Sequence, residues 1–259
     1  MSRKTKTKTK MKSSISQLKL FKACRRAYYF KYHEKLEPIQ KADALQTGLS
    51  YHERIEEIYD GTYQMQLGDY SKERAMAEAY YKYIYPQIPW VKTEQWVSKP
   101  DGLHEMIGRV DGVAENGYLV EHKTTSAEIT EAYEYDLQWD EQILAYMYMT
   151  GARKMYYTVC RKPTIRQKQN ESEEEFFNRM VEWYDTDTDS KIRLLIVERT
   201  DQEVEEFAKD FRAMCDMMQM STNYYRNTQH CNKWGRRCEY ASICLNYDPN
   251  QVYTGFTKG

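Results

Sequence analysis

Residues 108–125 read GRVDGVAENGYLVEHKTT, and this stretch decides the fold. Two runs rich in β-forming residues flank the Asn-Gly pair at 116–117, which is typical of a tight hairpin turn. Side chains alternate along a strand, so Glu121 and Lys123 share one face of the second run. Asp111 ends the first run. We therefore expect two acids and a lysine at one level of two adjacent strands.

Two carboxylates and a lysine in this arrangement suit the metal-dependent hydrolysis of a phosphodiester. Carboxylate oxygens hold Mg²⁺ or Mn²⁺, and the metal lowers the pKa of a water and neutralises charge on the phosphate. A nearby lysine can orient that water or stabilise the transition state. The same pattern also fits the solvated face of an ordinary antiparallel hairpin, so other parts of the chain must decide between the two.

Composition places the chain among globular proteins. It has 259 residues, 41% of them hydrophobic and 30% charged, which is enough for one large domain or two small ones. The formal net charge is −1, so any contact with nucleic acid must come from local patches. No apolar run approaches the length of a membrane span, and no apolar segment follows the lysine-rich N-terminus. We expect a cytoplasmic protein without a membrane partner.

Periodicity and turn signals divide the chain into helices and strands. We expect a disordered basic tail over 1–12 and one domain over 13–259, made of a helical part (13–90), a catalytic core (91–220) and a cysteine-rich segment (221–259). Helices are predicted over 14–36, 42–59, 71–85, 132–149, part of 166–190, and from 201 onward; strands are predicted over 91–98, 154–160, 191–199 and the two arms of the hairpin. This order predicts an α/β (α+β) fold with a mixed or mostly antiparallel sheet. A glycine-rich phosphate loop is lacking, which argues against an ATPase or kinase.

Four short motifs occur in a fixed order along the chain. They are His52 on an early helix, Gly108-x-x-Asp111, Glu121-x-Lys123, and Gln142-x-x-x-Tyr146 on the helix after the hairpin. This set resembles the PD-(D/E)XK nuclease superfamily, in its RecB-type branch. The resemblance implies a restriction-endonuclease-like core with a central mixed sheet flanked by helices. It also implies a Mg²⁺ or Mn²⁺ ion held by His52, Asp111, Glu121 and the backbone carbonyl of His122, catalysis by Asp111, Glu121 and Lys123, and contacts to the site or the DNA from Gln142 and Tyr146.

The six cysteines fall into two groups. Cys160 and Cys215 lie in apolar patterns and are expected to be buried. The other four are Cys24, Cys231, Cys238 and Cys244. One early and three late cysteines resemble the iron–sulfur staple of exonucleases in the same branch, including CRISPR-adaptation nucleases, where a [4Fe–4S] cluster joins the helical N- and C-terminal ends. Here six residues separate the first two late cysteines, where some members have two. A Zn²⁺ site therefore remains an alternative interpretation of these four cysteines, as do reduced free thiols.

The resemblance implies a metal-dependent DNA exonuclease that acts on single strands or free ends. The chain also resembles phage-encoded recombination or degradation nucleases. This likeness implies a helicase or recombination partner and, for a phage protein, the host cytoplasm. Two alternatives stay open on the same residues. One is a catalytically silent DNA-binding or assembly protein of the same fold, and the other is an endonuclease for structured or double-stranded DNA.

Overall fold

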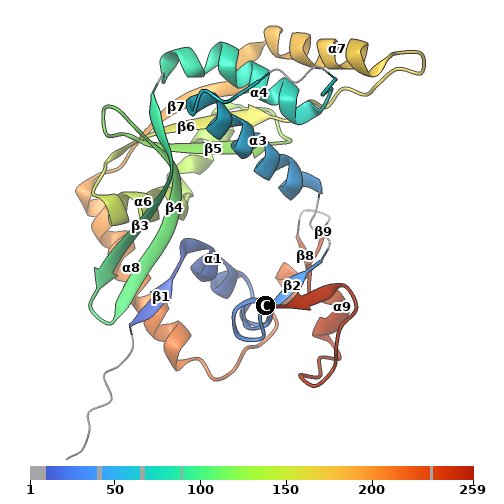
Figure 1. Cartoon of the computed structure of the whole chain (residues 1–259). Coiled ribbons are helices and arrows are strands. Elements are labelled where there is room, and N and C mark those ends of the chain that lie inside the picture. The colour runs from blue at the N-terminus through green and yellow to red at the C-terminus, as the bar shows by residue number, and fades with distance from the viewer. Residues whose placement is uncertain (1–9, 40–42, 65–67, 89, 234–235) are drawn as a thin grey trace, which may run out of the picture. The chain divides into compact units, whose positions relative to one another are not determined.

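The computed structural model describes residues 10–39, 43–64, 68–88, 90–233 and 236–259. Its main sheet has the order β1-β4-β5-β6-β7, with β3 also paired to β4 (Figure 1). Strand β5 runs antiparallel to β4 and parallel to β6, and β7 is antiparallel to β6. The predicted mixed sheet flanked by helices is confirmed. Its strands are β1 (Met11–Ser13), β3 (Val91–Asp101), β4 (His104–Ala114), β5 (Leu119–Thr125), β6 (Lys154–Arg161) and β7 (Ile192–Glu198).

The helices occupy most of the remaining described chain. The α-helices are α1 (Ile15–Ala23), α2 (Arg25–Tyr28), α3 (Asp43–Tyr59), α4 (Lys72–Tyr83), α5 (Glu131–Asp136), α6 (Glu141–Thr150), α7 (Glu173–Asp185), α8 (Asp201–Met220) and α9 (Ala241–Cys244). Shorter helices are η1 (Tyr29–His33), η2 (Tyr85–Gln87), η3 (Leu137–Trp139), η4 (Thr188–Ser190) and η5 (Thr228–His230). Two small ribbons pair β2 (Leu36–Pro38) with β10 (Phe256–Lys258), and β8 (Asn232–Lys233) with β9 (Arg236–Arg237). Among the described helices, none is both long enough and apolar enough to cross a membrane.

The chain forms two compact units. The first comprises residues 1–42, 98–108 and 206–259, and the second comprises residues 43–97 and 109–205. Strands β3 and β4 continue from one unit into the other. The single domain over 13–259 stays a prediction.

The predicted hairpin around Asn116 and Gly117 is present, and it pairs β4 with β5. The backbone N–H of Gly117 donates to the carbonyl of Ala114, and Gly117 has a φ of 80°. A left-handed φ of this kind is why glycine follows asparagine in such turns. The turn fixes the register, in which Gly112 pairs with Val120. Continuing that register places Asp111 opposite Glu121.

Strand β5 is covered on both faces in the second unit. Its residue His122 contacts Tyr80 of α4, with ring centroids 5.3 Å apart, whereas the neighbouring Glu121 accepts a hydrogen bond from Gln142 of α6. Successive side chains of a strand point to opposite faces, so α4 and α6 lie on opposite sides of β5. The apolar core under α3 and α4 includes Tyr51 and Val120, which are fully buried. This layering places Glu121 and Lys123 on the α6 side of β5 and His122 on the α4 side.

Two helices predicted as continuous are interrupted. The helix expected over 14–36 stops at Cys24, whose backbone is extended, with φ −161° and ψ 111°. The helix expected over 132–149 is divided by Asp140, which is also extended and caps the N-terminus of α6 by accepting from the backbone N–H of Gln142. Apolar periodicity continues through both breaks, so periodicity alone does not locate them. The predicted end of that helix at Gly151 is confirmed by its φ of 82°.

The expected disordered tail over 1–12 is wrong at its end. Residues 1–9 lie outside the described residues, but Met11–Ser13 form β1 and pair in parallel with His104, Glu105 and Met106 of β4. The open edge of β4 supplies backbone donors and acceptors that this lysine-rich stretch can join. Ser13 is fully buried there.

Candidate metal centre and cysteine cluster

The second unit brings together side chains from five elements. His52 lies on α3, Glu94 on β3, Asp111 on β4, Glu121 and Lys123 on β5, and Gln142 and Tyr146 on α6. Each of the four predicted motifs therefore contributes to one region of the structure. Glu94 adds a residue that no motif indicated.

A histidine and two carboxylates form the first part of the site. Potential ligand atoms of His52, Glu94 and Asp111 all lie within 4.8 Å of one another. His52 Nδ1 is 3.6 Å from Asp111 Oδ2, which also accepts the backbone N–H of His122 at 2.8 Å. This hydrogen bond fixes the carboxylate across the β4–β5 pair. One imidazole and two carboxylates are a suitable donor set for a divalent cation.

A hydrogen-bonded chain forms the second part. Lys123 Nζ donates to Glu121 Oε1 and, at 3.1 Å, to Gln142 Oε1. Gln142 Nε2 donates to the same Glu121 oxygen at 2.9 Å and lies 3.0 Å from the hydroxyl of Tyr146. That hydroxyl donates to the carbonyl of Arg109 at 2.8 Å. These hydrogen bonds tie α6 to both strands of the hairpin and hold Lys123 in place.

Glu121 leaves one oxygen for an additional ligand. Its side chain is 3% exposed, and its Oε2 is buried with no hydrogen-bond partner among the described residues. An unpaired buried carboxylate oxygen is costly. A metal ion bound there would remove that cost, so the residues present fit a divalent cation.

Burial perturbs the protonation of these groups. Burial, opposed by the charge of Lys123, raises the pKa of Asp111 to about 6. Burial and then the charge of Asp111 raise the pKa of Glu121 to about 7. Burial lowers the pKa of His52, which favours the neutral imidazole that binds metal. Burial would lower the pKa of Lys123, but the neighbouring carboxylates outweigh it and raise that pKa, so the ammonium stays charged.

Comparison with known proteins identifies the family. A family model described as the PD-(D/E)XK nuclease superfamily matches residues 12–99 and 71–245. The chain belongs to the PD-(D/E)XK nuclease superfamily.

Solved structures show how this PD-(D/E)XK nuclease compares in fold. A protein assigned as an exonuclease from Eubacterium rectale aligns with a TM-score of 0.50 and 11% identity, covering 87% of this chain and 89% of that one. The protein SSO0001 aligns with a TM-score of 0.47 and 13% identity, covering 93% and 89%. An alkaline exonuclease from Laribacter hongkongensis aligns with a TM-score of 0.39 and 14% identity, covering 80% and 88%. No curated protein matches the chain in sequence.

Glu94 is the site residue that sequence reasoning missed in this PD-(D/E)XK nuclease. It lies within β3 but has a φ of 52°, a left-handed conformation that is strained for a residue with a side chain. Arg109 Nε lies 2.5 Å from Glu94 Oε2. The segment VKTEQW reads as an ordinary strand, in which one glutamate looks like a solvated side chain. Strain and the cross-strand contact are tertiary features, so no sequence signal could have found them.

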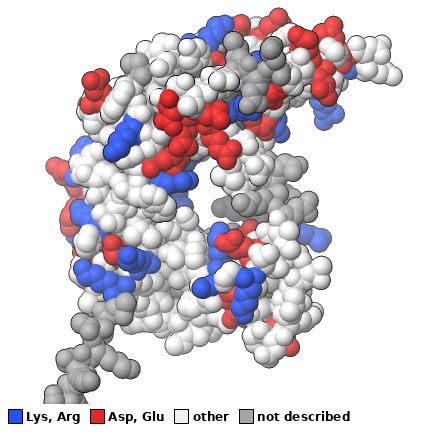
Figure 2. Space-filling model, in the orientation of Figure 1, with Lys and Arg blue, Asp and Glu red and all other residues white. Residues whose placement is uncertain are grey.

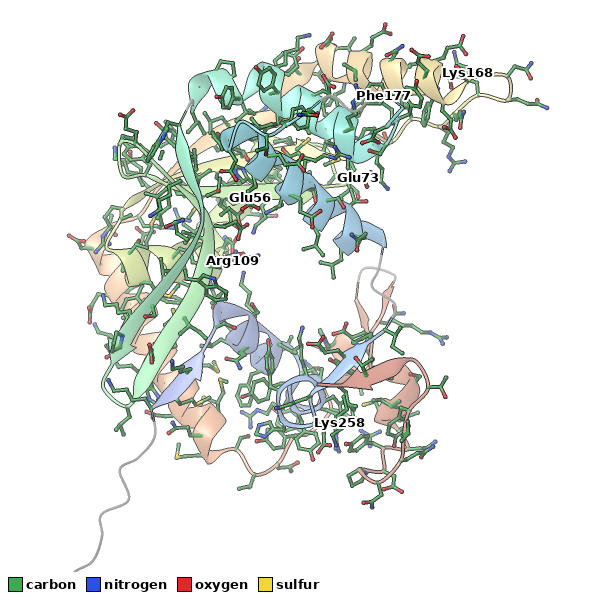
Figure 3. All side chains as sticks on the ribbon, viewed as in Figure 1. Glu56, Glu73, Arg109, Lys168, Phe177 and Lys258 are labelled. Carbon is green, nitrogen blue, oxygen red and sulfur yellow. The ribbon has the colours of Figure 1, made fainter. Side chains whose placement is uncertain are left out.

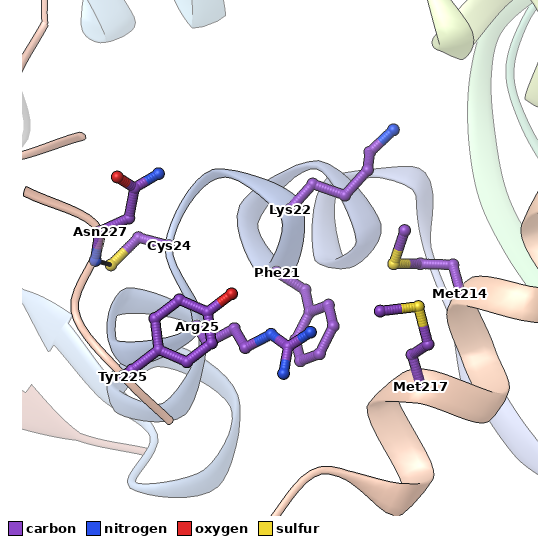
Figure 4. Close-up of a pocket in the computed structure, with 8 residues that line it drawn as sticks. All are labelled: Phe21, Lys22, Cys24, Arg25, Met214, Met217, Tyr225 and Asn227. Atoms are coloured by element: carbon purple, nitrogen blue, oxygen red, sulfur yellow. Dashed lines mark hydrogen bonds between the residues drawn. The ribbon is translucent and has the colours of Figure 1, made fainter. Parts of the chain in front are cut away.

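The four cysteines singled out by spacing lie together in the first unit. Asn227 connects two of them. Its backbone N–H donates to Cys24 Sγ at 3.5 Å (Figure 4), and its carbonyl lies 3.8 Å from Cys231 Sγ. The backbone N–H of Cys238 donates to the carbonyl of Cys231 at 2.9 Å. Cys24, Cys238 and Cys244 pack into one apolar cluster, and burial raises the pKa of both Cys238 and Cys244. Sequence positions more than two hundred residues apart thus meet in one cluster.

The break at Cys24 has a local cause. Asn227 Nδ2 donates at 2.8 Å to the carbonyl of Ala23, a helix-terminal group that would otherwise need a partner. The extended backbone at Cys24 then directs its thiol toward Asn227, as Figure 4 shows. Cys160 and Cys215 are buried, as expected, in other parts of the chain.

Proposed function

We propose that this PD-(D/E)XK nuclease is a Mg²⁺- or Mn²⁺-dependent deoxyribonuclease that degrades DNA from single strands or free ends. The observation that carries the proposal is Glu121, which has one oxygen held by Lys123 and Gln142 and the other buried without a partner among the described residues. A carboxylate fixed in this way is prepared to bind a cation without rearrangement. The preference for single strands or ends rests on the resemblance of the motifs to RecB-type exonucleases.

The metal would be held by side chains from four elements, α3, β3, β4 and β5. We assign His52, Asp111 and Glu121 as ligands, with the backbone carbonyl of His122, and Glu94 as a further carboxylate. When bound, Mg²⁺ or Mn²⁺ supplies Lewis-acid chemistry, which activates water and neutralises charge on the phosphate. The raised pKa of Asp111 and of Glu121 means that loading the site displaces protons near neutral pH.

Lys123 acts beside these ligands. Its ammonium is fixed between Glu121 and Gln142 and remains charged. Its side chain is 29% exposed, so a phosphate or a water can reach it. A preorganised positive charge of this kind stabilises the negative charge that develops as the phosphodiester is attacked. Gln142 positions Lys123, and Tyr146 positions Gln142 through its own bond to β4.

Cleavage of three DNA substrates tests this function. Purified protein is incubated with end-labelled linear single strands, linear duplex, and covalently closed circular DNA, each with Mg²⁺, Mn²⁺ or EDTA. The expected result is metal-dependent loss of linear strands, with circles spared. Cleavage in EDTA would contradict the metal centre, and equal cutting of circles would favour the endonuclease. A protein that binds DNA but never cuts it would favour the silent alternative.

We further propose that Cys24, Cys231, Cys238 and Cys244 hold a structural [4Fe–4S] cluster. The packing of Cys24, Cys238 and Cys244 in one cluster and the contacts of Asn227 with Cys24 and Cys231 support a common site. A tetrahedral zinc ion with Zn–S bonds near 2.3 Å would hold sulfurs only about 3.8 Å apart. Among the described cysteines, no three sulfurs lie within 4.8 Å of one another, so the thiols would have to move together to hold zinc. Anaerobic purification followed by iron, sulfide and zinc determination tests it; zinc without iron would transfer the site to zinc.

A further inference from the structure

An exposed tryptophan and an arginine lie next to the metal centre. Trp96 on β3 is 76% exposed. The guanidinium carbon of Arg109 on β4 lies 6.0 Å from the centroid of the Trp96 ring, which is cation–π distance. The Arg109 side chain is itself 54% exposed, and Figure 3 marks its place on β4. Trp96 therefore presents an aromatic ring to solvent, beside the half-exposed guanidinium of Arg109.

This pair is connected to the proposed ligands on both strands. Arg109 Nε contacts Glu94, and the Arg109 carbonyl accepts the hydroxyl of Tyr146. Arg109 also lies two residues before Asp111, so the two side chains share one face of β4. Two residues of a strand span about 7 Å. The platform formed by Trp96 and Arg109 is thus about one nucleotide away from the level of the metal centre.

Long-range charge offers DNA little attraction in this unit. The whole chain has a net charge of −1, and Figure 2 shows acidic side chains gathered over α3. Glu53, Glu56 and Glu57 lie on this helix, which also carries His52. A strand that reaches the metal centre therefore needs local contacts. Base stacking on an aromatic ring and one guanidinium–phosphate contact are contacts of that kind, and stacking tolerates any base.

We propose that Trp96 and Arg109 form the subsite for the nucleotide next to the scissile phosphate, with an unpaired base stacked on Trp96 and a phosphate held by Arg109. This inference rests on the proposed function and deepens it, since it names what selects a single strand. A paired base in a duplex is already stacked on both sides. The platform therefore favours unpaired nucleotides at ends or in single strands.

DNA binding without cleavage tests the platform. Fluorescence anisotropy of a labelled single strand is measured with Ca²⁺ in place of Mg²⁺ for wild type, Trp96→Ala and Trp96→Phe. Loss of one stacked base weakens binding by roughly 5- to 100-fold, so Trp96→Ala should show that loss and Trp96→Phe should recover most of it. Trp90→Ala is the matched control, because Trp90 is 55% exposed and lies outside β3, six residues before Trp96.

Salt dependence tests the arginine. Arg109→Gln should lower the slope of log affinity against log salt by about 0.7, as expected for one lost phosphate contact on a single strand. Unchanged single-strand binding in Trp96→Ala, an equal loss in Trp90→Ala, or an equal loss with blunt duplex would overturn the platform. Wild-type protein that binds no single strand would overturn it too. Failure of wild type to cleave DNA concerns the proposed function instead, and the binding comparison keeps its meaning in that case.

Discussion

Replacing Asp111 by asparagine should stabilise the metal-free protein. Burial raises the pKa of Asp111 from 3.8 to about 6, so the folded state holds its proton more tightly than the unfolded state. The free energy of unfolding therefore falls as pH rises from about 4 to 6, and the whole cost of burying the Asp111 charge is present at pH 8. A shift of about two pKa units at about 1.4 kcal/mol each is about 3 kcal/mol. Asparagine removes the charge and can keep the bond from the His122 backbone.

The assay is thermal unfolding in EDTA. With relaxation around the site we expect a gain of about 1–3 kcal/mol, which corresponds to a rise in Tm of about 2 to 10 °C at pH 8 for a chain of this size. Below pH 4 the gain should shrink toward zero, because the carboxyl is then protonated in both states. Asp60→Asn, at an exposed position, is the control and should leave Tm unchanged. A lower Tm for Asp111→Asn at pH 8 would refute the electrostatic account of the site.

Three other changes have defined outcomes. Gly112→Ala should lower the free energy of unfolding by about 1–3 kcal/mol in urea titrations, because the new methyl group would overlap Val91 Cγ1. Unchanged stability would show that β3 moves aside freely. Mn²⁺ at a hundred times its Kd should add about 2.7 kcal/mol to the free energy of unfolding. Mn²⁺ should bind more weakly at pH 6 than at pH 8, because Glu121 must lose a proton. Equal affinities at the two pH values would contradict that linkage. Cys24→Ser should lose the iron and the absorbance near about 400 nm of a thiolate-ligated cluster, whereas Cys160→Ser should keep both; iron retained in Cys24→Ser would exclude Cys24 as a ligand.

Local sequence signals predicted the hairpin well. An Asn-Gly turn and alternating side chains act over a few residues, so the antiparallel pair of β4 and β5 and its charged residues follow from sequence. Motif order, through resemblance to a family, added His52, Gln142 and Tyr146. The structure places all of these in one region of the second unit.

Features that depend on tertiary contacts could not be predicted. Glu94 joins the site through a strained backbone and a contact with Arg109 from another strand. The extended residues Cys24 and Asp140 interrupt helices whose apolar periodicity continues without change. The break at Cys24 is stabilised by a hydrogen bond from Asn227, two hundred residues away, which no local propensity encodes. The break at Asp140 is a local cap, in which Asp140 accepts from the backbone N–H of Gln142.

The central claim is that Lys123 acts in metal-dependent cleavage beside Glu121. Its most direct test is the single-turnover rate of DNA cleavage by Lys123→Met, with Mn²⁺ binding verified by calorimetry on the same sample. Lys168→Met, at an exposed loop position labelled in Figure 3, is the control. We expect a rate about 10²- to 10³-fold below wild type for Lys123→Met, in line with the loss of one preorganised donor at a developing charge. A wild-type rate in that variant, with the metal bound, would contradict it.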